Sequence, residues 1–409
     1  MELFRREKYL SKIRAFYHAD DIIKVITGVR RCGKSSLMQT IAEELQEQGV
    51  PPQNIVYIDL DRREYRDIRV PDRLEQLIVR QCSAAGMNYL FIDEIQNVAG
   101  FEEVINGFRT EGGYSIFITG SNSYLLSGEL ATKLTGRYLE FELYTLTFDE
   151  YIRMKKFYGK EVSPDTAAEL NRYILEGGFP RTITLEGTDA RRQYVRGVVN
   201  EIFEKDIRTR VKIRKTETFR IVRDYIINNF GATTSVKRLC DELNRNGLPV
   251  TRATVNRYIQ ALIDAKILYP CDRFDMKSRR SLSGEKKYYL ADSGFYFSVN
   301  TDNRINYGPV LENIVYLYAL SIGYAVSVGR IGKLEVDFIL RDSSQNYSYV
   351  QVAYTILASR ETEDREYRPL EEIRDNYAKY VMTTDRLLQK RNGILHVNLE
   401  DFIINGSRF

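Results

Sequence analysis

The chain has 409 residues, 43% of them hydrophobic, and a net charge of only +4, which fits a multidomain protein of roughly two to four domains of about 100 to 200 residues each. No stretch reaches the roughly 18 uncharged apolar residues of a membrane span, and the charged N-terminus MELFRREKYLSKIR lacks the apolar region of a signal peptide, so we expect a cytoplasmic protein without membrane contact. Four widely spaced cysteines and two histidines argue against a disulfide framework, a zinc site and other histidine-based metal sites.

The first recognisable segment is a strand followed by a glycine-rich loop and a helix. The apolar run from Ile22 to Thr27 leads into GVRRCGKS (28–35), and the following SLMQTIAEELQEQG has the apolar spacing of a helix that ends at Gly49. In this context GxxxxGKS is a P-loop, whose backbone N–H groups cradle phosphates, while its lysine reaches the β and γ phosphates and its serine binds Mg²⁺. We therefore expect ATP and Mg²⁺ as cofactors. The predicted nucleotide-binding residues of this loop are Gly28, Val29, Arg30, Arg31, Cys32, Gly33, Lys34, Ser35 and Ser36.

A pair of acids ends the apolar strand in NYLFIDEIQ (88–96), which follows another apolar strand at 54–60. A fully buried strand of this kind belongs in a parallel sheet, whose ligand crevice lies at the carboxyl ends of the strands. We expect Asp93, together with Ser35, to hold Mg²⁺, and Glu94 to polarise the attacking water. The alternative is a solvated acid pair, but the P-loop about 60 residues upstream favours the catalytic interpretation.

Two more polar positions follow in the same part of the chain. The strand in YSIFITGSN (114–122) should lie beside the P-loop strand, so that Ser121 or Asn122 contacts the γ-phosphate or the attacking water. Arg137 comes after a glycine turn and before another strand, which suits an arginine finger that acts within the chain or across the subunit boundary of a homo-oligomer. A surface arginine beside Glu140 is the equally open alternative. Lys34, Glu94 and Arg137 are thus the predicted catalytic residues.

The motifs GVRRCGKSSL, LFIDEIQNV, ITGSNSYLLSGELATKLTGRYLEFEL and TFDEYI, with EGGFPR, KYYLADSGF and GPVLENIVY further on, resemble one family. It comprises bacterial and archaeal AAA+ type ATPases that join a P-loop domain to a winged helix and a C-terminal nuclease-like domain of unknown function. The resemblance implies an α/β fold with a P-loop parallel sheet and a helical lid, then a winged helix-turn-helix, then a small α/β nuclease-like domain. The expected domains are 1–146 (ATPase core), 147–214 (lid), 215–300 (winged helix-turn-helix) and 301–409 (nuclease-like).

The predicted lid shows helical periodicity that GGFP interrupts at Gly177–Pro180. Arg181, directly after this turn, could approach the nucleotide from the lid as a sensor arginine. An arginine that caps a helix is the alternative interpretation.

The middle of the chain is basic, since residues 201–300 hold 20 Lys and Arg against 12 Asp and Glu. Such a segment is typical of a module that faces double-stranded DNA, although solvated helix faces produce the same imbalance. Its pattern is helix, helix, turn, helix and two strands, with Thr251 as a helix N-cap, and this order predicts a winged helix-turn-helix. The second helix of the motif should enter the major groove and the wing should touch phosphates. The predicted DNA-binding residues are Arg252, Thr254, Asn256 and Arg257 on the helix, and Arg279, Arg280, Lys286 and Lys287, with Lys277, in or beside the wing.

The C-terminal segment resembles a PD-(D/E)XK nuclease core, because a helix, three strands, a charged helix (365–376) and a strand at KYVMTT follow one another. Glu312 and Asp337 stand where active members carry metal-binding acids. The third strand instead supplies Gln351 and Ala353, so an acid becomes an amide and the lysine becomes a methyl group. Mg²⁺ prefers anionic oxygens, and no lysine on this strand stabilises the transition state, so we expect an inactive, vestigial site at Glu312, Asp337 and Gln351. A lysine from a neighbouring element, Lys333 or Lys379, would be the way to restore activity.

Three functions remain open from the sequence. The leading one is a Mg²⁺-dependent ATPase that couples nucleotide state to DNA contact through the winged helix. The second is an ATP-regulated, metal-dependent nuclease, and the third is a nucleotide-switched module that binds a protein partner without nucleic acid.

Overall fold

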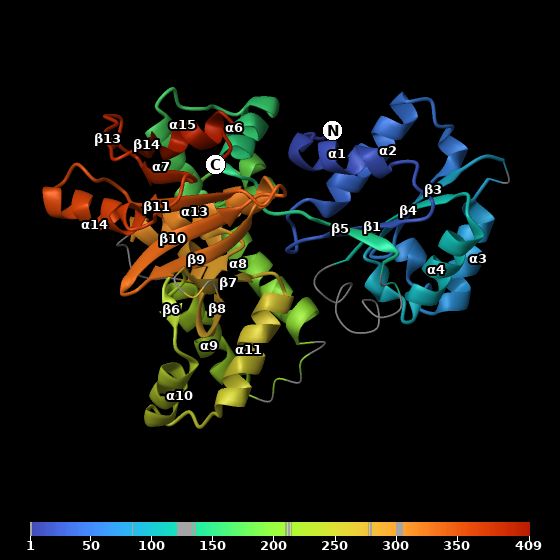
Figure 1. The fold of residues 1–409 in the computed structure, drawn as a ribbon. Coiled ribbons are helices and arrows are strands. Elements are labelled where there is room, and N and C mark those ends of the chain that lie inside the picture. The colour runs from blue at the N-terminus through green and yellow to red at the C-terminus, as the bar shows by residue number, and fades with distance from the viewer. Residues whose placement is uncertain are drawn as a thin grey trace. The chain divides into compact units, whose positions relative to one another are not determined.

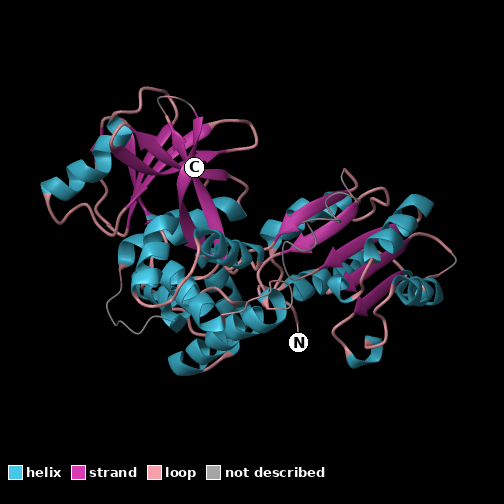
Figure 2. Cartoon of the chain, turned by 90° about the horizontal axis from the view of Figure 1, so that it is seen from below, coloured by secondary structure: helices cyan, strands magenta, loops and turns pink. Residues whose placement is uncertain are grey.

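The computed structural model describes residues 2–83, 85–120, 134, 136–208, 211, 213, 215–276, 278, 280–299 and 306–409 (Figure 1). These residues form two compact units, and each is described by itself. The first unit is Met1–Tyr144 with Asp264–Lys266, and the second is Thr145–Ile263 with Ile267–Phe409. Figure 2 shows that strands and flanking helices occur in both units. Within the described ranges, no helix is both long and apolar enough to cross a membrane.

The first unit contains a parallel sheet of five strands in the order β2-β3-β4-β1-β5. The strands are β1 (Ile23–Thr27), β2 (Ile55–Asp59), β3 (Asn88–Asp93), β4 (Tyr114–Thr119) and β5 (Tyr138–Glu142). β1 and β3 are buried along their whole length, as continuous apolar runs in a parallel sheet require. The prediction that the strand at 114–119 lies beside the P-loop strand is confirmed, because β4 pairs with β1.

Helices cover both faces of this sheet, with α1 and α2 on one side and α3 and α4 on the other (Figure 1). The helices are α1 (Glu7–Ile13), α2 (Lys34–Glu47), α3 (Pro71–Gln81) and α4 (Phe101–Glu111). Because strand side chains alternate between faces, Ile23 and Val25 pack with α3 and α4, whereas Lys24 lies over the ring of Phe117. Pro71 at the first position of α3 lacks an N–H that the helix could not have used.

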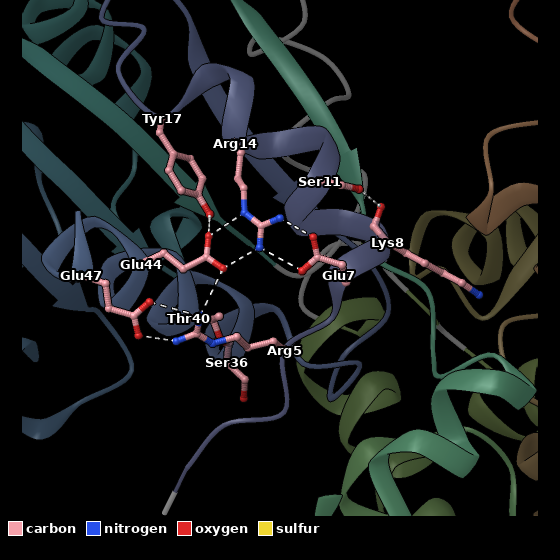
Figure 3. A network of polar contacts seen from close by, with 10 residues as sticks. All are labelled: Arg5, Glu7, Lys8, Ser11, Arg14, Tyr17, Ser36, Thr40, Glu44 and Glu47. Carbon is pink, nitrogen blue, oxygen red and sulfur yellow. Dashed lines mark hydrogen bonds and ion pairs between the residues drawn. The ribbon is translucent and has the colours of Figure 1, made fainter. Parts of the chain in front are cut away.

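A polar network ties the N-terminal segment to α2, the helix that begins in the P-loop (Figure 3). Arg14 donates to both carboxylate oxygens of Glu44, at 2.9 and 2.7 Å, and the Tyr17 hydroxyl donates to Glu44 at 2.8 Å. Glu44 is 4% exposed, and the hydrogen bond from Arg14 is the main reason that the pKa of its carboxyl lies below its ordinary value. The network therefore anchors α2 to the segment before β1.

The second unit starts with helices, as predicted for 147–214. They are α6 (Phe148–Phe157), α7 (Thr166–Glu176) and α8 (Thr188–Glu201), followed by the π-helical turn η7 (Ile202–Ile207), with the 3₁₀ turn η6 (Pro180–Thr184) between α7 and α8. A capping box starts α6, in which Thr147 and Glu150 satisfy each other's backbone N–H groups. The assignment of this segment as a lid stays a prediction.

The basic middle folds into three helices and a hairpin. Its elements are α9 (Thr216–Asn228), β6 (Thr233–Thr234), α10 (Val236–Arg245), α11 (Arg252–Asp264), β7 (Leu268–Asp275) and β8 (Arg280–Leu290), and α12 (Ser293–Val299) follows. Thr251 caps α11 as predicted, because its Oγ1 accepts a hydrogen bond from the backbone N–H of Thr254 at 3.2 Å.

The hairpin of the basic middle and the C-terminal strands form one sheet, which the sequence did not predict. The sheet has nine strands in the order β13-β14-β12-β11-β10-β9-β7-β8-β6, and β7 pairs in parallel with β9. The C-terminal elements are α13 (Tyr307–Ser321), β9 (Ala325–Ile331), β10 (Leu334–Arg341), β11 (Tyr347–Val352), α14 (Arg360–Glu371), β12 (Ala378–Thr383), β13 (Lys390–Arg391), β14 (Ile394–Asn398) and α15 (Leu399–Ile404). Strands from both sides of the expected boundary at 300 therefore belong to the same sheet.

Candidate nucleotide site and C-terminal acid cluster

The loop between β1 and α2 has the conformation that a P-loop requires. Gly28 and Gly33 have φ of 141° and 108°, and Arg31 has φ of 68°. A Cβ on Gly28 would lie 2.1 Å from the carbonyl oxygen of Leu143, so this position accepts only glycine. Val29, Arg30 and Cys32 are buried, whereas Arg31, Ser35 and Ser36 are exposed at the start of the helix. Burial raises the pKa of the Cys32 thiol, which keeps this group protonated and unreactive.

Lys34 lies against its own loop. Its Nζ donates hydrogen bonds to the carbonyl oxygens of Gly28 at 3.0 Å and Val29 at 3.4 Å, and the residue is 5% exposed. Among the residues that the structure describes, two neutral carbonyl oxygens of its own loop hold the ammonium. Anionic phosphate oxygens would be stronger acceptors for the same group.

Asp93 lies at the carboxyl end of β3 and contacts two hydroxyl groups. It is buried, and burial raises the pKa of its carboxyl, whereas hydrogen bonds from Ser35 and Thr119 act in the opposite direction. The predicted pair of Ser35 and Asp93 is thus brought together by the fold. A buried carboxylate and a hydroxyl are hard oxygen donors, so these residues fit Mg²⁺.

Glu94 follows in a left-handed conformation with φ of 55°, which is rare for a residue other than glycine. Its backbone N–H donates to Thr119 Oγ1 at 3.2 Å, and its carboxylate accepts a hydrogen bond from the Gln96 amide. Thr119 Oγ1 in turn donates to Asp93. Thr119 therefore positions both acids. Sequence reasoning missed it, because a threonine at the end of an apolar strand carries no signal that its hydroxyl faces a neighbouring strand.

Arg6 is a second residue that the sequence reasoning missed. It is 6% exposed, and its Nη1 donates to the carbonyl oxygens of Tyr144 at 2.7 Å and Cys32 at 3.3 Å. Arg6 thus links the P-loop to Tyr144, where the first stretch of the first unit ends. No local sequence pattern predicts this role, because the partners Cys32 and Tyr144 lie 26 and 138 residues away from Arg6 along the chain.

The structure contradicts the prediction that Arg137 acts on the P-loop of its own chain. β5 runs parallel to β1, and the Arg137 carbonyl accepts a hydrogen bond from the N–H of Ile23, at the amino end of both strands. The P-loop leaves the opposite end of β1, roughly 16 Å away at about 3.3 Å per residue. Arg137 Nη1 instead donates to Asn106 of α4 at 3.2 Å. Two other predicted contacts are not tested by this geometry. Ser121 and Asn122 lie outside the described residues, and Arg181 is an exposed residue of η6 in the second unit.

The predicted DNA-binding residues of the helix lie together on α11. Arg252, Asn256 and Arg257 are exposed, and Thr254 is half-buried next to the capping residue Thr251. A cavity of about 630 Å³ opens beside the start of this helix. It is lined by Lys215, Thr218, Asn244, Pro249, Val250, Thr251, Thr254, Arg257 and Tyr258.

The structure alters the prediction that the lysines of the β7–β8 hairpin contact DNA. Lys286 pairs with Asp272 of the same hairpin at 2.8 Å. Lys287 is 5% exposed and pairs with Glu312 and Glu335, so the prediction that it contacts DNA phosphates is wrong, because a buried, neutralised ammonium does not reach DNA. Lys277 and Arg279 lie outside the described residues, as does the side chain of Arg280.

The expected vestigial residues come together in the nine-stranded sheet. The β10–β11 backbone ladder begins at Phe338 and Val350. Beyond it, Gln351 Oε1 accepts from the N–H of Asp337 at 3.2 Å, and Asp337 Oδ2 accepts from the N–H of Val352 at 2.8 Å. These side-chain hydrogen bonds hold β10 and β11 together beyond the point where the backbone hydrogen bonds between the two strands end. The oxygens of Asp337 and Gln351 therefore have a structural role. Burial raises the pKa of the Asp337 carboxyl, and the nearby Glu312 raises it further. Among the described residues, no group of three or more acids, histidines and cysteines is arranged to hold a metal ion.

Comparison with known proteins identifies the first unit. Residues 20–152 match the profile of a family described as an AAA domain, and residues 167–304 match a domain of unknown function (DUF8612). An uncharacterized protein of Haemophilus influenzae is 33% identical over 382 residues, which covers 93% of each chain. Uncharacterized protein MJ1544 of Methanocaldococcus jannaschii is 28% identical over 366 residues, or 87% of this chain and 80% of that protein.

A solved structure agrees with the fold. The Walker-type ATPase PABY2304 of Pyrococcus abyssi superposes with a TM-score of 0.51 at 14% identity, over 73% of this chain and 96% of that one. At this identity the likeness shows the fold alone. The P-loop α/β fold predicted from the sequence is thereby confirmed, and the AAA match includes the P-loop, Asp93 and Glu94.

Proposed function

We propose that this chain, which belongs to the same AAA-domain family as the uncharacterized Haemophilus influenzae protein, binds ATP with Mg²⁺ and hydrolyses it. The observation that carries the proposal lies at the carboxyl edge of the parallel sheet. There Lys34 lies against the P-loop, Ser35 contacts Asp93, and Thr119 bonds to both Asp93 and Glu94. This edge is where open α/β sheets bind their ligands.

Each of these side chains has a separate role in phosphoryl transfer. Lys34 exchanges the carbonyl oxygens of its loop for the β and γ phosphates, to which its positive charge is better matched. Ser35 and Asp93 would hold Mg²⁺, and the ion would supply positive charge against the charge that develops on the phosphates. Glu94 orients the attacking water and accepts its proton, and its carboxylate is held in place by Gln96.

Phosphate release by wild type, Lys34→Ala and Glu94→Gln tests hydrolysis. We expect both variants to lose most activity, with Glu94→Gln still retaining ATP in a filter-binding assay, because its P-loop is intact. Lys156→Ala and Glu111→Gln remove the same groups from exposed positions and serve as matched controls. Equal rates in all five proteins would refute the proposal.

We also propose that residues 215–300 are a winged helix-turn-helix that contacts double-stranded DNA through α11. The element order and the exposed Arg252, Asn256 and Arg257 support it. Arginine and asparagine have the hydrogen-bond geometry for guanine and adenine edges. Each lost phosphate contact lowers the slope of log affinity against log salt by about 0.9.

The test compares two double variants of the same module by fluorescence anisotropy. Arg252→Ala with Arg257→Ala should weaken DNA binding and flatten its salt dependence, whereas Lys237→Ala with Arg238→Ala removes two exposed charges from α10 and should change little. Binding that does not depend on salt, or an equal loss in both double variants, would contradict DNA contact by α11. In that case capture of a protein partner from nuclease-treated extract would favour the protein-interaction function.

Arg6 offers a route by which nucleotide state could reach the second unit. It contacts a carbonyl of the P-loop and the carbonyl of Tyr144, whose peptide bond leads directly into Thr145 of the second unit. We propose that a change of the loop on ATP binding alters this contact. DNA affinity measured with ATP and with ADP should differ in wild type and converge in Arg6→Met; a difference of unchanged size in Arg6→Met would refute the route.

For the C-terminal segment we propose a nuclease-like fold without nuclease activity. The supporting observation is that Asp337 and Gln351 direct their oxygens to backbone N–H groups of the neighbouring strand. We expect no Mg²⁺- or Mn²⁺-dependent cleavage of single- or double-stranded DNA. Cleavage that Asp337→Ala abolishes would establish the nuclease function instead.

A further inference from the structure

A buried lysine and two half-buried acids lie where β8, α13 and β10 meet in the second unit. Lys287 Nζ lies 2.8 Å from Glu335 Oε1 and 3.4 Å from Glu312 Oε2. Glu312 Oε2 also accepts a hydrogen bond from the Tyr289 hydroxyl at 2.9 Å. One ammonium of β8 therefore serves two carboxylates that come from two other elements.

The negative charges of these acids are already neutralised by nearby cations. Glu335 also pairs with Arg273 of β7, so two cations face Glu312 and Glu335. The third acid, Asp337, uses Oδ2 to accept from the N–H of Val352. A charge removed from water requires such pairing, because an uncompensated buried charge is strongly destabilising.

A divalent cation would need more free oxygens than this arrangement leaves. Mg²⁺ takes about six oxygen ligands in near-octahedral geometry. In the described part of the cluster, Glu312 serves Tyr289 and Lys287, while Asp337 serves a backbone N–H. An ammonium has three donors and no strict geometry, so it suits two carboxylates that are not arranged around a common centre.

We propose that Lys287 is the resident cation of this cluster, and that its ammonium takes the place of a divalent cation among Glu312, Glu335 and Asp337. The ammonium thereby fastens the β7–β8 hairpin to α13 and β10. It also closes the cluster to metals in the wild-type protein. This inference does not rest on ATP hydrolysis or on DNA binding.

The substitution Lys287→Met tests the proposal, because it removes the charge and keeps the approximate length of the side chain. Glu312 and Glu335 then lose the ammonium that pairs with both of them, so the negative charge left beside Asp337 attracts a divalent ion more strongly than in wild type. Titration of nucleotide-free protein with Mn²⁺, followed by electron paramagnetic resonance of the free ion, should show at least about tenfold tighter binding than in wild type, and Asp337→Asn in the same chain should remove the gain. Lys286→Met, which changes the neighbouring half-buried lysine, is the matched control and should behave as wild type.

Two results would overturn the proposal. The first is a folded Lys287→Met protein that binds Mn²⁺ no better than wild type. The second is wild-type Mn²⁺ binding that weakens in the single variant Asp337→Asn, because the native cluster would then hold a metal beside Lys287. This second comparison does not depend on the folding of Lys287→Met, so it decides alone if that variant fails to fold.

Discussion

The substitution Thr119→Val removes one hydroxyl that serves both predicted acids of the nucleotide site. Thr119 Oγ1 donates to Asp93 and accepts from the N–H of Glu94, and valine has nearly the same shape. A hydrogen bond to a charged group contributes roughly 1.5–3 kcal/mol, which corresponds to about one to two units in the pKa of Asp93. The pKa of this carboxyl is already raised by burial and held down by Ser35 and Thr119. It should rise further in Thr119→Val.

The assay is phosphate release at saturating Mg²⁺ and ATP over about pH 5 to 9. In Thr119→Val the acid limb of the profile should move to higher pH by about one to two pH units. On the plateau, a loss of roughly 1.4 kcal/mol of transition-state stabilisation slows phosphate release about tenfold. Thr119→Ser keeps the hydroxyl and should keep the wild-type limb. A purely structural role would lower the rate equally at every pH. An unmoved acid limb in Thr119→Val would therefore refute the role of Thr119 as a positioning residue.

Three further predictions concern stability and assembly. Arg14→Met should lower the free energy of unfolding, measured in urea titrations, by roughly 1–2 kcal/mol. Breaking a fully buried pair costs roughly 3–5 kcal/mol, and the loss here is smaller because Arg14 is partly exposed. In a chain that already carries Glu44→Gln, Arg14→Met should have little further effect. Burial raises the pKa of Asp292 to about 7, so this carboxyl binds more protons in the folded state than in the unfolded state between about pH 4 and pH 7. Its contribution to stability therefore falls as pH rises through this window. Asp292→Asn should make the measured slope of unfolding free energy against pH shallower, and an equal slope in both proteins would contradict this. If Arg137 acts across a subunit boundary, Arg137→Ala and Glu94→Gln should each be inactive while their mixture regains phosphate release; an inactive mixture would argue against this role.

Elements with a strong local pattern were predictable from the sequence. Continuous apolar runs gave the strands of the parallel sheet, and GxxxxGKS gave the loop and the start of α2. The charged helix predicted at 365–376 instead spans Arg360–Glu371, because Ser359 caps it by accepting from the N–H of Thr362. The pairing of β7 with β9 joins residues about 55 positions apart, and short apolar strands carry no local signal that chooses a distant partner.

The candidate nucleotide site was predictable where a residue acts through its type and its place in a motif. Lys34, Ser35, Asp93 and Glu94 meet these conditions. Thr119 contributes through the direction of one hydroxyl at a strand end, and a threonine there is ordinary in sequence. The misplacement of Arg137 has a topological cause, since its role depends on whether β5 runs parallel or antiparallel to β1.

The net charge of residues 201–300 does not show which of the cations are paired with acids in the folded protein. Lys287 contributes to the net charge of residues 201–300 but is buried between two acids. Arg273 pairs with Glu335 of β10, and Lys286 pairs with Asp272 of its own hairpin. A cation that is neutralised in the folded state attracts DNA phosphates only weakly, because the partner acid repels them. The arginines of α11 are exposed, and they follow a capped helix start that the sequence announced through Thr251. The proposal of DNA contact therefore depends on the placement of Arg252 and Arg257, and the overall charge of the segment adds little to it.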